Sequence, residues 1–214
     1  MSPSPPDAVQ HGPAPPIVVK VGGSLFDWPD LKPRLASYLA SLGGEPVLLV
    51  PGGGRAADAV RELDRVHSLG EVKSHWLALR SLTTNAHFLA DLLGLQVTES
   101  LHAARFAWRR TPAIILDPLR FARGDESRPD HLPHVWTATS DSIAARVARV
   151  AEAQRLILLK SVAIPSAMDW TAAAQRGLVD KMFAELVAGA RFTVEGVNLR
   201  TWNDPVAAGT IHPV

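Results

Sequence analysis

The sequence predicts an α/β fold in which a parallel β-sheet is covered by helices on both faces. Short runs rich in Val, Ile and Leu alternate along the chain with longer segments whose apolar residues recur at helical spacing. Runs that are apolar at nearly every position suit strands buried on both faces, and helical connections between them suit parallel pairing. Glycines or charged residues follow several of the predicted strands. They therefore lie at the carboxyl ends of the strands, where parallel sheets bind ligands.

Composition limits the classes of protein to consider. The chain has 214 residues, of which 47% are hydrophobic, so it can bury one substantial core. There are 22 Lys and Arg against 21 Asp and Glu, and this balance does not predict nucleic acid as a partner. Apolar runs are far shorter than the roughly 18 residues of a membrane helix, and no secretory signal is evident at the N-terminus. We therefore expect no membrane partner.

The chain contains no cysteine. This excludes disulfide bonds, thiolate catalysis and zinc sites with cysteine ligands, and it is compatible with the predicted cytoplasmic location. Residues 1–16 are rich in Pro, with Ser, Gly and Ala, and are predicted to be a disordered tail. Residues 17–214 are predicted to form a single domain.

The first part of the chain alternates strand and helix. A β-branched strand is predicted at 17–21, followed by a helix from Leu31 that ends at the glycine pair 43–44. A second strand at 47–50 is closed by Pro51 and three glycines. Further helices are then predicted at 55–69, 72–93 and 100–108, with a short strand at 95–98 between the last two.

The rest of the chain continues the alternation less regularly. A strand is predicted at 113–116, then a polar stretch over 119–138, and then a helix to about residue 151 capped by Thr139 or Ser140. The remaining elements expected are strands at 156–159, 192–195 and 210–212, a loop to about residue 177, and a helix at 179–188.

Two glycine turns mark candidate anion sites. Gly22 and Gly23 follow a strand that contains Lys20, and glycine there lets the backbone approach a ligand and offer it N–H groups. The ordinary alternative is a simple turn. The three glycines 52–54 precede a helix, whose N-terminus also attracts anions, although a flexible connection would look similar. Two anion sites at one sheet edge suggest phosphoryl transfer between two phosphate-bearing ligands.

The segment Thr139-Ser140-Asp141-Ser142 opens a helix. By itself it is read most simply as an N-cap with an acid in the first turn. If the sheet edge binds phosphate, Asp141 can instead orient two lysines or help to hold a metal. Lys160 closes an apolar strand and is either a solvated strand end or part of the same site.

His131, His134 and Trp136 lie shortly before this helix. Their spacing does not predict a zinc site, and no residue is assigned as a metal ligand. As a functional interpretation we favour a lid or a wall of the substrate site.

Taken in order, these motifs resemble the amino acid kinase superfamily. The segments that carry the resemblance are 19–24, 50–55, 139–142, 156–160 and 208–210. The resemblance implies an open αβα sandwich with a mainly parallel sheet of about eight strands, use of ATP and Mg²⁺, a small-molecule phosphate acceptor, and a homo-oligomer.

The resemblance also implies roles for individual residues. Lys20, Asp141 and Lys160 would be catalytic, with Lys20 on the transferring phosphoryl group and Asp141 holding the lysines in place. ATP would be bound by Lys20, Gly22, Gly23, Ser24, Lys160, Ser161 and Val162. The acceptor would be bound by Gly52, Gly53, Gly54, Arg55, Asp58, His134 and Trp136.

Within the superfamily, the segments 58–64, 74–78, 134–142 and 178–180 resemble the methanofuran-biosynthesis kinases. That branch implies ATP-dependent conversion of [5-(aminomethyl)furan-3-yl]methyl phosphate to its diphosphate. An acid would be needed for the cationic amine, and Asp58, Asp64 and Asp117 are the candidates.

Two alternatives remain at the level of sequence. One is a kinase for a nucleoside phosphate or an isoprenoid phosphate. The other is a non-catalytic nucleotide-binding or regulatory subunit. The second is suggested by two departures from the superfamily pattern, because Ser161–Pro165 replaces a Thr-Asp-Val-Asp-Gly loop and Gly177–Lys181 lacks the Gly-Gly-Met-x-x-Lys spacing.

Overall fold

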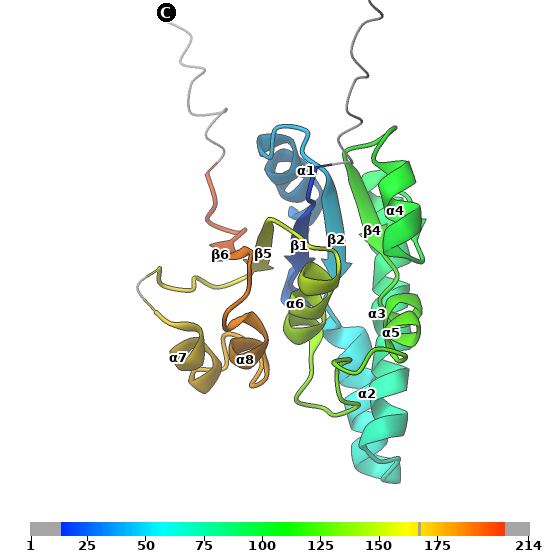
Figure 1. Ribbon diagram of the computed structural model, residues 1–214. Helices are drawn as coiled ribbons and strands as arrows, with labels where there is room; N and C mark the ends of the chain where they lie inside the picture. Colours follow the sequence, from blue (N-terminus) through cyan, green and yellow to red (C-terminus); the bar gives the residue numbers. More distant parts are fainter. Residues whose placement is uncertain (1–13, 167, 204–214) are drawn as a thin grey trace, which may run out of the picture.

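The computed structural model describes residues 14–166 and 168–203 and shows one parallel β-sheet between layers of helices (Figure 1). The sheet order is β3-β4-β2-β1-β5-β6, and every strand pair is parallel. The strands are β1 (Ile17–Val21), β2 (Val47–Pro51), β3 (Val97–Thr98), β4 (Ala113–Leu116), β5 (Arg155–Lys160) and β6 (Thr193–Asn198). The predicted α/β class with a parallel sheet is therefore confirmed.

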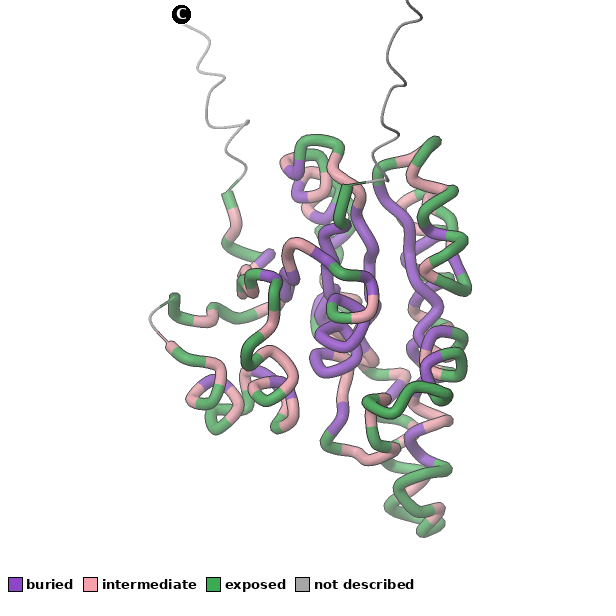
Figure 2. Tube along the Cα trace, viewed as in Figure 1, coloured by how far each residue is buried: buried purple, intermediate pink, exposed green. Residues whose placement is uncertain are grey.

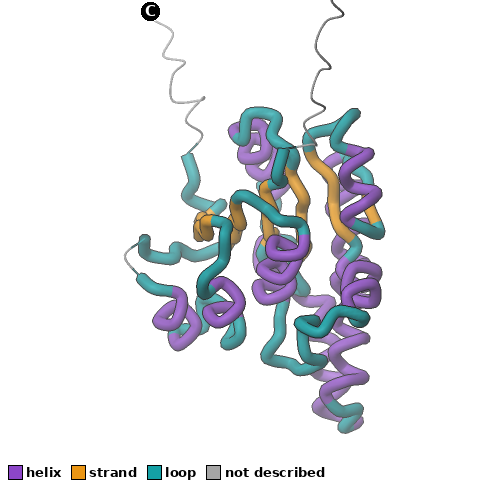
Figure 3. The backbone as a smooth tube through the Cα atoms, in the orientation of Figure 1, coloured by secondary structure: helices purple, strands orange, loops and turns teal. Residues whose placement is uncertain are grey.

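Helices cover both faces of the sheet, as Figure 3 shows. They are α1 (Leu31–Ser41), α2 (Gly54–His67), α3 (Glu71–Leu93), α4 (Leu101–Ala107), α5 (Pro118–Asp125), α6 (Ser140–Val150), α7 (Trp170–Gln175) and α8 (Phe183–Val187), with a short 3₁₀ turn η1 (Gly23–Leu25). No helix in the described part of the chain is both long enough and apolar enough to cross a membrane.

Two hydrophobic clusters fill the space between the layers. One face of the sheet packs against α4, α5, α6, α7 and α8, and the other packs against α1. The helix α3 contributes to both clusters, through Leu79 and Leu82 on one side and through Ala86 and Leu89 on the other. The four inner strands are buried along almost their whole length (Figure 2), which explains their uniformly apolar sequences.

The chain changes direction across the sheet at β1. The connection from β1 to β2 passes through α1 on one face, and the connection from β4 to β5 passes through α5 and α6 on the opposite face. Ligands of open α/β sheets bind beyond the carboxyl ends of strands at such a switch point. The fold therefore directs attention to the ends of β1 and β5.

Several elements differ from the sequence-based expectation. About eight strands were expected from the resemblance, whereas the described residues form six. The expected loop to residue 177 was wrong, since Asp169 accepts a hydrogen bond from the Ala172 amide at 2.7 Å and starts α7. The expected helix at 179–188 is only α8.

Within the polar stretch 119–138 the structure forms the helix α5, which the sequence analysis did not predict. Asp117 accepts hydrogen bonds from the amides of Leu119 and Arg120, and Pro118 occupies the first turn, where its missing N–H is not needed. The predicted strand at 210–212 and most of the predicted tail lie outside the described residues.

Candidate active site

Asp141 lies between two lysine side chains at the carboxyl ends of β1 and β5. Its Oδ1 is 2.8 Å from Lys20 Nζ, an ion pair whose geometry falls outside that of a hydrogen bond, and its Oδ2 accepts a hydrogen bond from Lys160 Nζ at 2.6 Å. The side chains of Lys20 and Asp141 are about 5% exposed, and that of Lys160 is 12% exposed. Three charges are thus held together almost entirely out of water.

Strand geometry places the two lysines on one face. Side chains alternate between the faces of a sheet, so Lys20 points to the same side as Val18, and Lys160 to the same side as Leu158. Lys20 pairs in register with Leu158, so Lys160 lies two residues further along β5. Both therefore face α6, whose first turn carries Asp141.

The electrostatic balance of this cluster follows from its burial and its charges. Burial by itself raises the pKa of Asp141, but the nearby ammonium groups of Lys20 and Lys160 outweigh it and keep that pKa below its ordinary value. Burial, and then the positive charge of Lys20, lower the pKa of Lys160 to about 8. One carboxylate between two ammonium groups leaves one positive charge in excess, which suits an anionic ligand.

Asp180 fixes the start of α6 from outside the helix. Its Oδ2 accepts hydrogen bonds from the Thr139 amide at 3.1 Å, the Thr139 hydroxyl at 2.8 Å and the Ser142 amide at 2.9 Å. Its Oδ1 accepts from the Ser142 hydroxyl and from the amides of Met182 and Phe183. The predicted cap residue Thr139 makes no side-chain cap of its own.

Sequence reasoning assigned Asp180 no structural role. Asp180 lay within the helix expected at 179–188, and its partners lie about 40 residues away in the chain, so local pattern could not reveal them.

The two glycine turns touch each other. A Cβ on Gly23 would lie 2.2 Å from the amide nitrogen of Gly54, and a Cβ on Gly52 would lie 2.5 Å from that of Gly23. Side chains at these positions would force the turns apart. Asn85 on α3, which the sequence analysis did not single out, donates hydrogen bonds of 2.8 Å to the carbonyl oxygens of Gly52 and Gly53 and holds the second turn in place.

A cavity of about 230 Å³ opens beside the glycine turns. Gly23, Ser24, Gly53 and Gly54 form one part of its wall, and α2, α3 and the start of α6 form the rest. The cavity reaches Ser140, the residue before Asp141, so the lysine pair adjoins the cavity without lining it.

The outer wall of the cavity carries polar groups. Asp58 and Arg61 both line it and form an ion pair of 2.5 Å, and the Arg61 guanidinium lies 5.3 Å from the ring centre of Trp136. Trp136 donates a hydrogen bond of 2.7 Å to Asp64, which also accepts from the Gly70 amide. Trp136 is therefore fixed as part of the wall.

These contacts separate the three acids considered for a cationic acceptor. Asp64 is occupied by Trp136 and Gly70, and Asp117 caps α5 and accepts a hydrogen bond of 2.6 Å from Thr83. Asp58 is the one of the three that lines the cavity.

Other predicted site residues lie around the cavity. His134 is not among its lining residues, since its ring packs against His75 and Trp76 and its Nε2 lies 2.7 Å from Glu126 Oε1. His75 lines the cavity, and burial lowers its pKa. Arg55 is largely exposed and forms an ion pair of 2.8 Å with Asp27, outside the cavity lining.

The residues predicted for the nucleotide lie where β5 ends. The Ser161 hydroxyl is 2.8 Å from that of Ser24, so the segment after β5 is joined to the turn after β1. Val162 is 50% exposed and can contact a ligand. The structure brings Lys20, Gly22, Gly23, Ser24, Lys160 and Ser161 into one region, while their roles remain predictions.

Comparison with known proteins identifies the family. The sequence profile of the amino acid kinase family matches residues 15–163, well over half of the chain. The chain belongs to the amino acid kinase family. The matched range contains both glycine turns, both lysines and Asp141, whereas Asp180 lies beyond it.

Individual relatives agree with this membership. The chain is 25% identical over 146 residues to [5-(aminomethyl)furan-3-yl]methyl phosphate kinase of Methanocaldococcus jannaschii, a match that covers 68% of this chain and 65%, slightly under two thirds, of that kinase. Among solved structures, uridylate kinase of Archaeoglobus fulgidus superimposes with a TM-score of 0.61 at 16% identity, covering 90% of this chain and 92% of the other. Isopentenyl phosphate kinase of T. acidophilum superimposes with a TM-score of 0.52 at 12% identity, covering 86% and 91%.

The residues present fit a nucleoside triphosphate. The glycine turns pack backbone against backbone at the carboxyl ends of β1 and β2, and the lysine pair adds positive charge beside them. The carboxylates Asp141, Asp58 and Asp180 are already paired with cations or hydrogen-bond donors. Mg²⁺ would accordingly be held mainly by phosphate oxygens and water.

Proposed function

We propose that this protein is an ATP- and Mg²⁺-dependent phosphotransferase that converts a small phosphate monoester to a diphosphate. The observation that carries the proposal is the pair of lysines held by Asp141 at the ends of β1 and β5, beside two glycine turns in contact with each other. This arrangement suits two phosphate-bearing ligands that meet end to end.

The residues of the chain would act by positioning and by neutralising charge. ATP would supply the phosphoryl group, and Mg²⁺ would reduce the repulsion between the phosphates. Lys20 would contact the transferring group and Lys160 would stabilise charge on the nucleotide side, while Asp141 keeps both ammonium groups in place. The described site therefore needs no covalent intermediate on the protein.

Each turn would hold one ligand. Gly22, Gly23 and Ser24 would bind the phosphates of ATP together with Ser161 and Val162 after β5. Gly52, Gly53 and Gly54 would bind the phosphate of the acceptor, whose remainder would occupy the cavity toward Asp58 and Trp136. Arg55 and His134, which do not line the cavity, would contribute indirectly.

We further propose [5-(aminomethyl)furan-3-yl]methyl phosphate as the acceptor. The proposal rests on the likeness to the kinase from M. jannaschii and on the form of the cavity. A volume of about 230 Å³ is below the range typical of sites for drug-sized ligands, which favours a small acceptor. A molecule with a phosphate at one end and an ammonium at the other would match the glycine turn and the Asp58 carboxylate.

The test is ADP release from Mg-ATP with three acceptors in parallel, namely the aminomethyl-furan monophosphate, uridylate and isopentenyl phosphate. Turnover confined to the furan compound is expected. Turnover with another acceptor would keep the phosphotransferase and reject the proposed acceptor. Bound ATP with no turnover on any acceptor would favour the non-catalytic alternative.

Asp58→Asn tests the placement of the amine. The variant should raise the KM for the aminomethyl-furan phosphate while changing kcat much less, because the carboxylate is remote from the reacting phosphates. Glu62→Gln is the matched control on the same helix, since its carboxylate pairs with Arg65 and does not line the cavity. If Asp58→Asn leaves the KM unchanged, the amine is bound elsewhere.

A further inference from the structure

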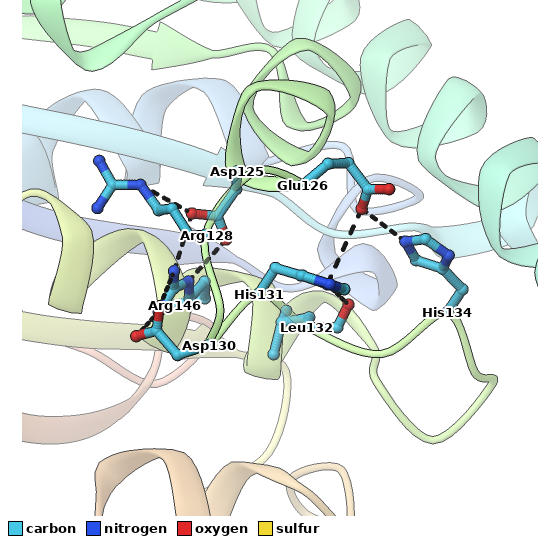
Figure 4. Close-up of polar contacts among 8 residues, drawn as sticks. All are labelled: Asp125, Glu126, Arg128, Asp130, His131, Leu132, His134 and Arg146. Atoms are coloured by element: carbon cyan, nitrogen blue, oxygen red, sulfur yellow. Dashed lines mark hydrogen bonds and ion pairs between the residues drawn. The ribbon is translucent and has the colours of Figure 1, made fainter.

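Two histidines and a glutamate come together at the end of α5, outside the proposed phosphate site. Glu126 follows α5, and His131 and His134 lie in the loop that leads to α6. One ligand atom from each of the three side chains lies within 4.8 Å of the other two. Figure 4 shows Glu126 placed between the two imidazole rings.

The neighbouring acids Asp125 and Asp130 are not available as metal ligands, because both are bound to Arg146. Arg146 donates hydrogen bonds to Asp125 at 2.7 and 2.9 Å and to Asp130 at 2.5 and 2.9 Å (Figure 4). Asp125 immediately precedes Glu126, and Asp130 immediately precedes His131. The same guanidinium therefore anchors the backbone at two of the three positions and leaves Glu126 free of any arginine partner in the described residues.

His131 turns its nitrogen Nδ1 toward Glu126. This Nδ1 lies 4.0 Å from Glu126 Oε1 and 3.0 Å from the carbonyl oxygen of Leu132. To bind a metal through Nδ1, the imidazole would exchange its contact with that carbonyl for the metal, with Nε2 carrying the proton.

A simple ion pair accounts for only part of the arrangement. His134 Nε2 lies 2.7 Å from Glu126 Oε1, which is a good hydrogen bond. It does not explain why His131 also lies 4.0 Å from the same oxygen. A cation with bonds of about 2.0–2.2 Å holds its ligand atoms somewhat more than 3 Å apart. The Glu126 and His131 side chains are partly exposed, so they can shift from their present separations to that distance.

We propose that Glu126, His131 and His134 form a binding site for one divalent transition-metal ion of the Zn²⁺ type. Two imidazole nitrogens and one carboxylate are the donors that such ions prefer, whereas Mg²⁺ prefers oxygen ligands alone. The bound ion would tie the loop to the end of α5. Because the loop also carries Trp136, the ion would hold a wall of the acceptor cavity in place.

The test uses the full chain, stripped of metal with a chelator and free of nucleotide. Zn²⁺ binding is measured by calorimetry, and Co²⁺ binding by its visible absorption, which distinguishes a site of low coordination number from hydrated ion. One equivalent should bind. Glu126→Gln, His131→Gln and His134→Gln should each raise the Kd for Zn²⁺ roughly tenfold or more.

His87→Gln is the matched control, since His87 is an exposed histidine on α3. It should leave the affinity unchanged, and circular dichroism should show that every variant is folded. If His134→Gln fails to fold, the partly exposed Glu126 still provides the test. The proposal is overturned if the unaltered chain shows no saturable binding, or if Glu126→Gln binds Zn²⁺ as tightly as the unaltered chain does.

Discussion

The helix α6 carries two ion clusters of opposite composition, centred on residues that are five positions apart and buried. At its N-terminus the carboxylate of Asp141 lies between two ammonium groups, and further along the guanidinium of Arg146 lies between the carboxylates of Asp125 and Asp130. The first cluster has an excess of positive charge, whereas in the second Arg146 and Arg128 together balance the two acids.

The difference lies in how completely the charges are satisfied. Arg146 makes four hydrogen bonds to its two acids, and Asp125 also receives a contact from Arg128 at 3.3 Å. The Asp141 cluster contains the Lys160–Asp141 hydrogen bond and the Lys20–Asp141 ion pair, and within the described residues Lys160 Nζ makes no other hydrogen bond. The Arg146 cluster is therefore suited to hold the fold, and the Asp141 cluster to bind an anion.

Removing the centre of the structural cluster should have the largest effect on stability. Arg146→Ala leaves the buried Asp125 with only the longer contact to Arg128, and breaking a buried pair costs about 3–5 kcal/mol. Urea unfolding measures the loss. The double variant Arg146→Met with Asp125→Asn should recover part of it, because no buried charge is then left unpaired. A loss below about 1 kcal/mol would contradict the structural assignment.

Removing a lysine of the other cluster should instead affect activity. Lys20→Ala is expected to lower kcat by roughly 10²–10³-fold, the effect typical of losing one group that stabilises transition-state charge. The steady-state rate of ADP release measures it, and Lys32→Ala, at an exposed lysine on α1, is the control. Full turnover by Lys20→Ala would remove Lys20 from the proposed mechanism.

Asp180 connects the anion-binding cluster to the rest of the fold. Asp180→Asn loses charged hydrogen bonds to the start of α6, and we expect a loss of about 1–3 kcal/mol in unfolding free energy and a lower kcat. Since the charge of Asp180 helps to keep the Lys160 pKa up, the variant should also move the alkaline fall in activity to lower pH.

Asp169→Asn is the matched control for Asp180→Asn. Asp169 is exposed and caps only α7, so its substitution should cost less stability and should leave the pH profile unchanged. Identical pH profiles for the two variants would show that Asp180 acts on stability alone.

The pH dependence gives the smallest effect. With a pKa of about 8, Lys160 loses its charge at mildly alkaline pH, so kcat/KM should fall about tenfold per pH unit above that value. Lys160→Arg should remove the fall in this range, because arginine stays charged. If kcat/KM of Lys160→Arg falls above a pH of about 8 as it does in the unaltered protein, deprotonation of Lys160 is not the cause of the fall.

The lowered pKa of Lys160 also makes the stability of the folded protein depend on pH. Between pH of about 8 and 10.5 the unfolded chain binds a proton at Lys160 that the folded chain has released, so this group makes the folded state relatively more stable as the pH rises through that window.

Much of the fold was predictable from the sequence because the information is local. Buried parallel strands are nearly continuous apolar runs, and long helices such as α3 show their period over many turns. Short helices were missed at α5 and α7, where a single capping aspartate decides the structure and the apolar pattern is too brief to detect. The count of strands came from resemblance alone, and it did not hold for the described residues.

The candidate site was only partly predictable. Lys20, Asp141 and Lys160 were named from motifs, and the structure does bring them together. Asn85, Arg61 and Asp180 gave no usable local signal, because each acts on a segment distant in the chain. Glu126 was not connected with His131 and His134, since the turn that joins them depends on Arg146 from a later helix.

The sequence by itself determined which residues share a face. Alternation along a strand puts Lys20 with Val18 and Lys160 with Leu158 whatever the neighbouring strands are. The tertiary structure decided that these two strands lie side by side, that α6 covers them on the lysine face, and that Asp180 holds the first turn of that helix there. Local periodicity fixes the direction of a side chain, whereas the meeting of charges 120 residues apart depends on the order of strands in the sheet.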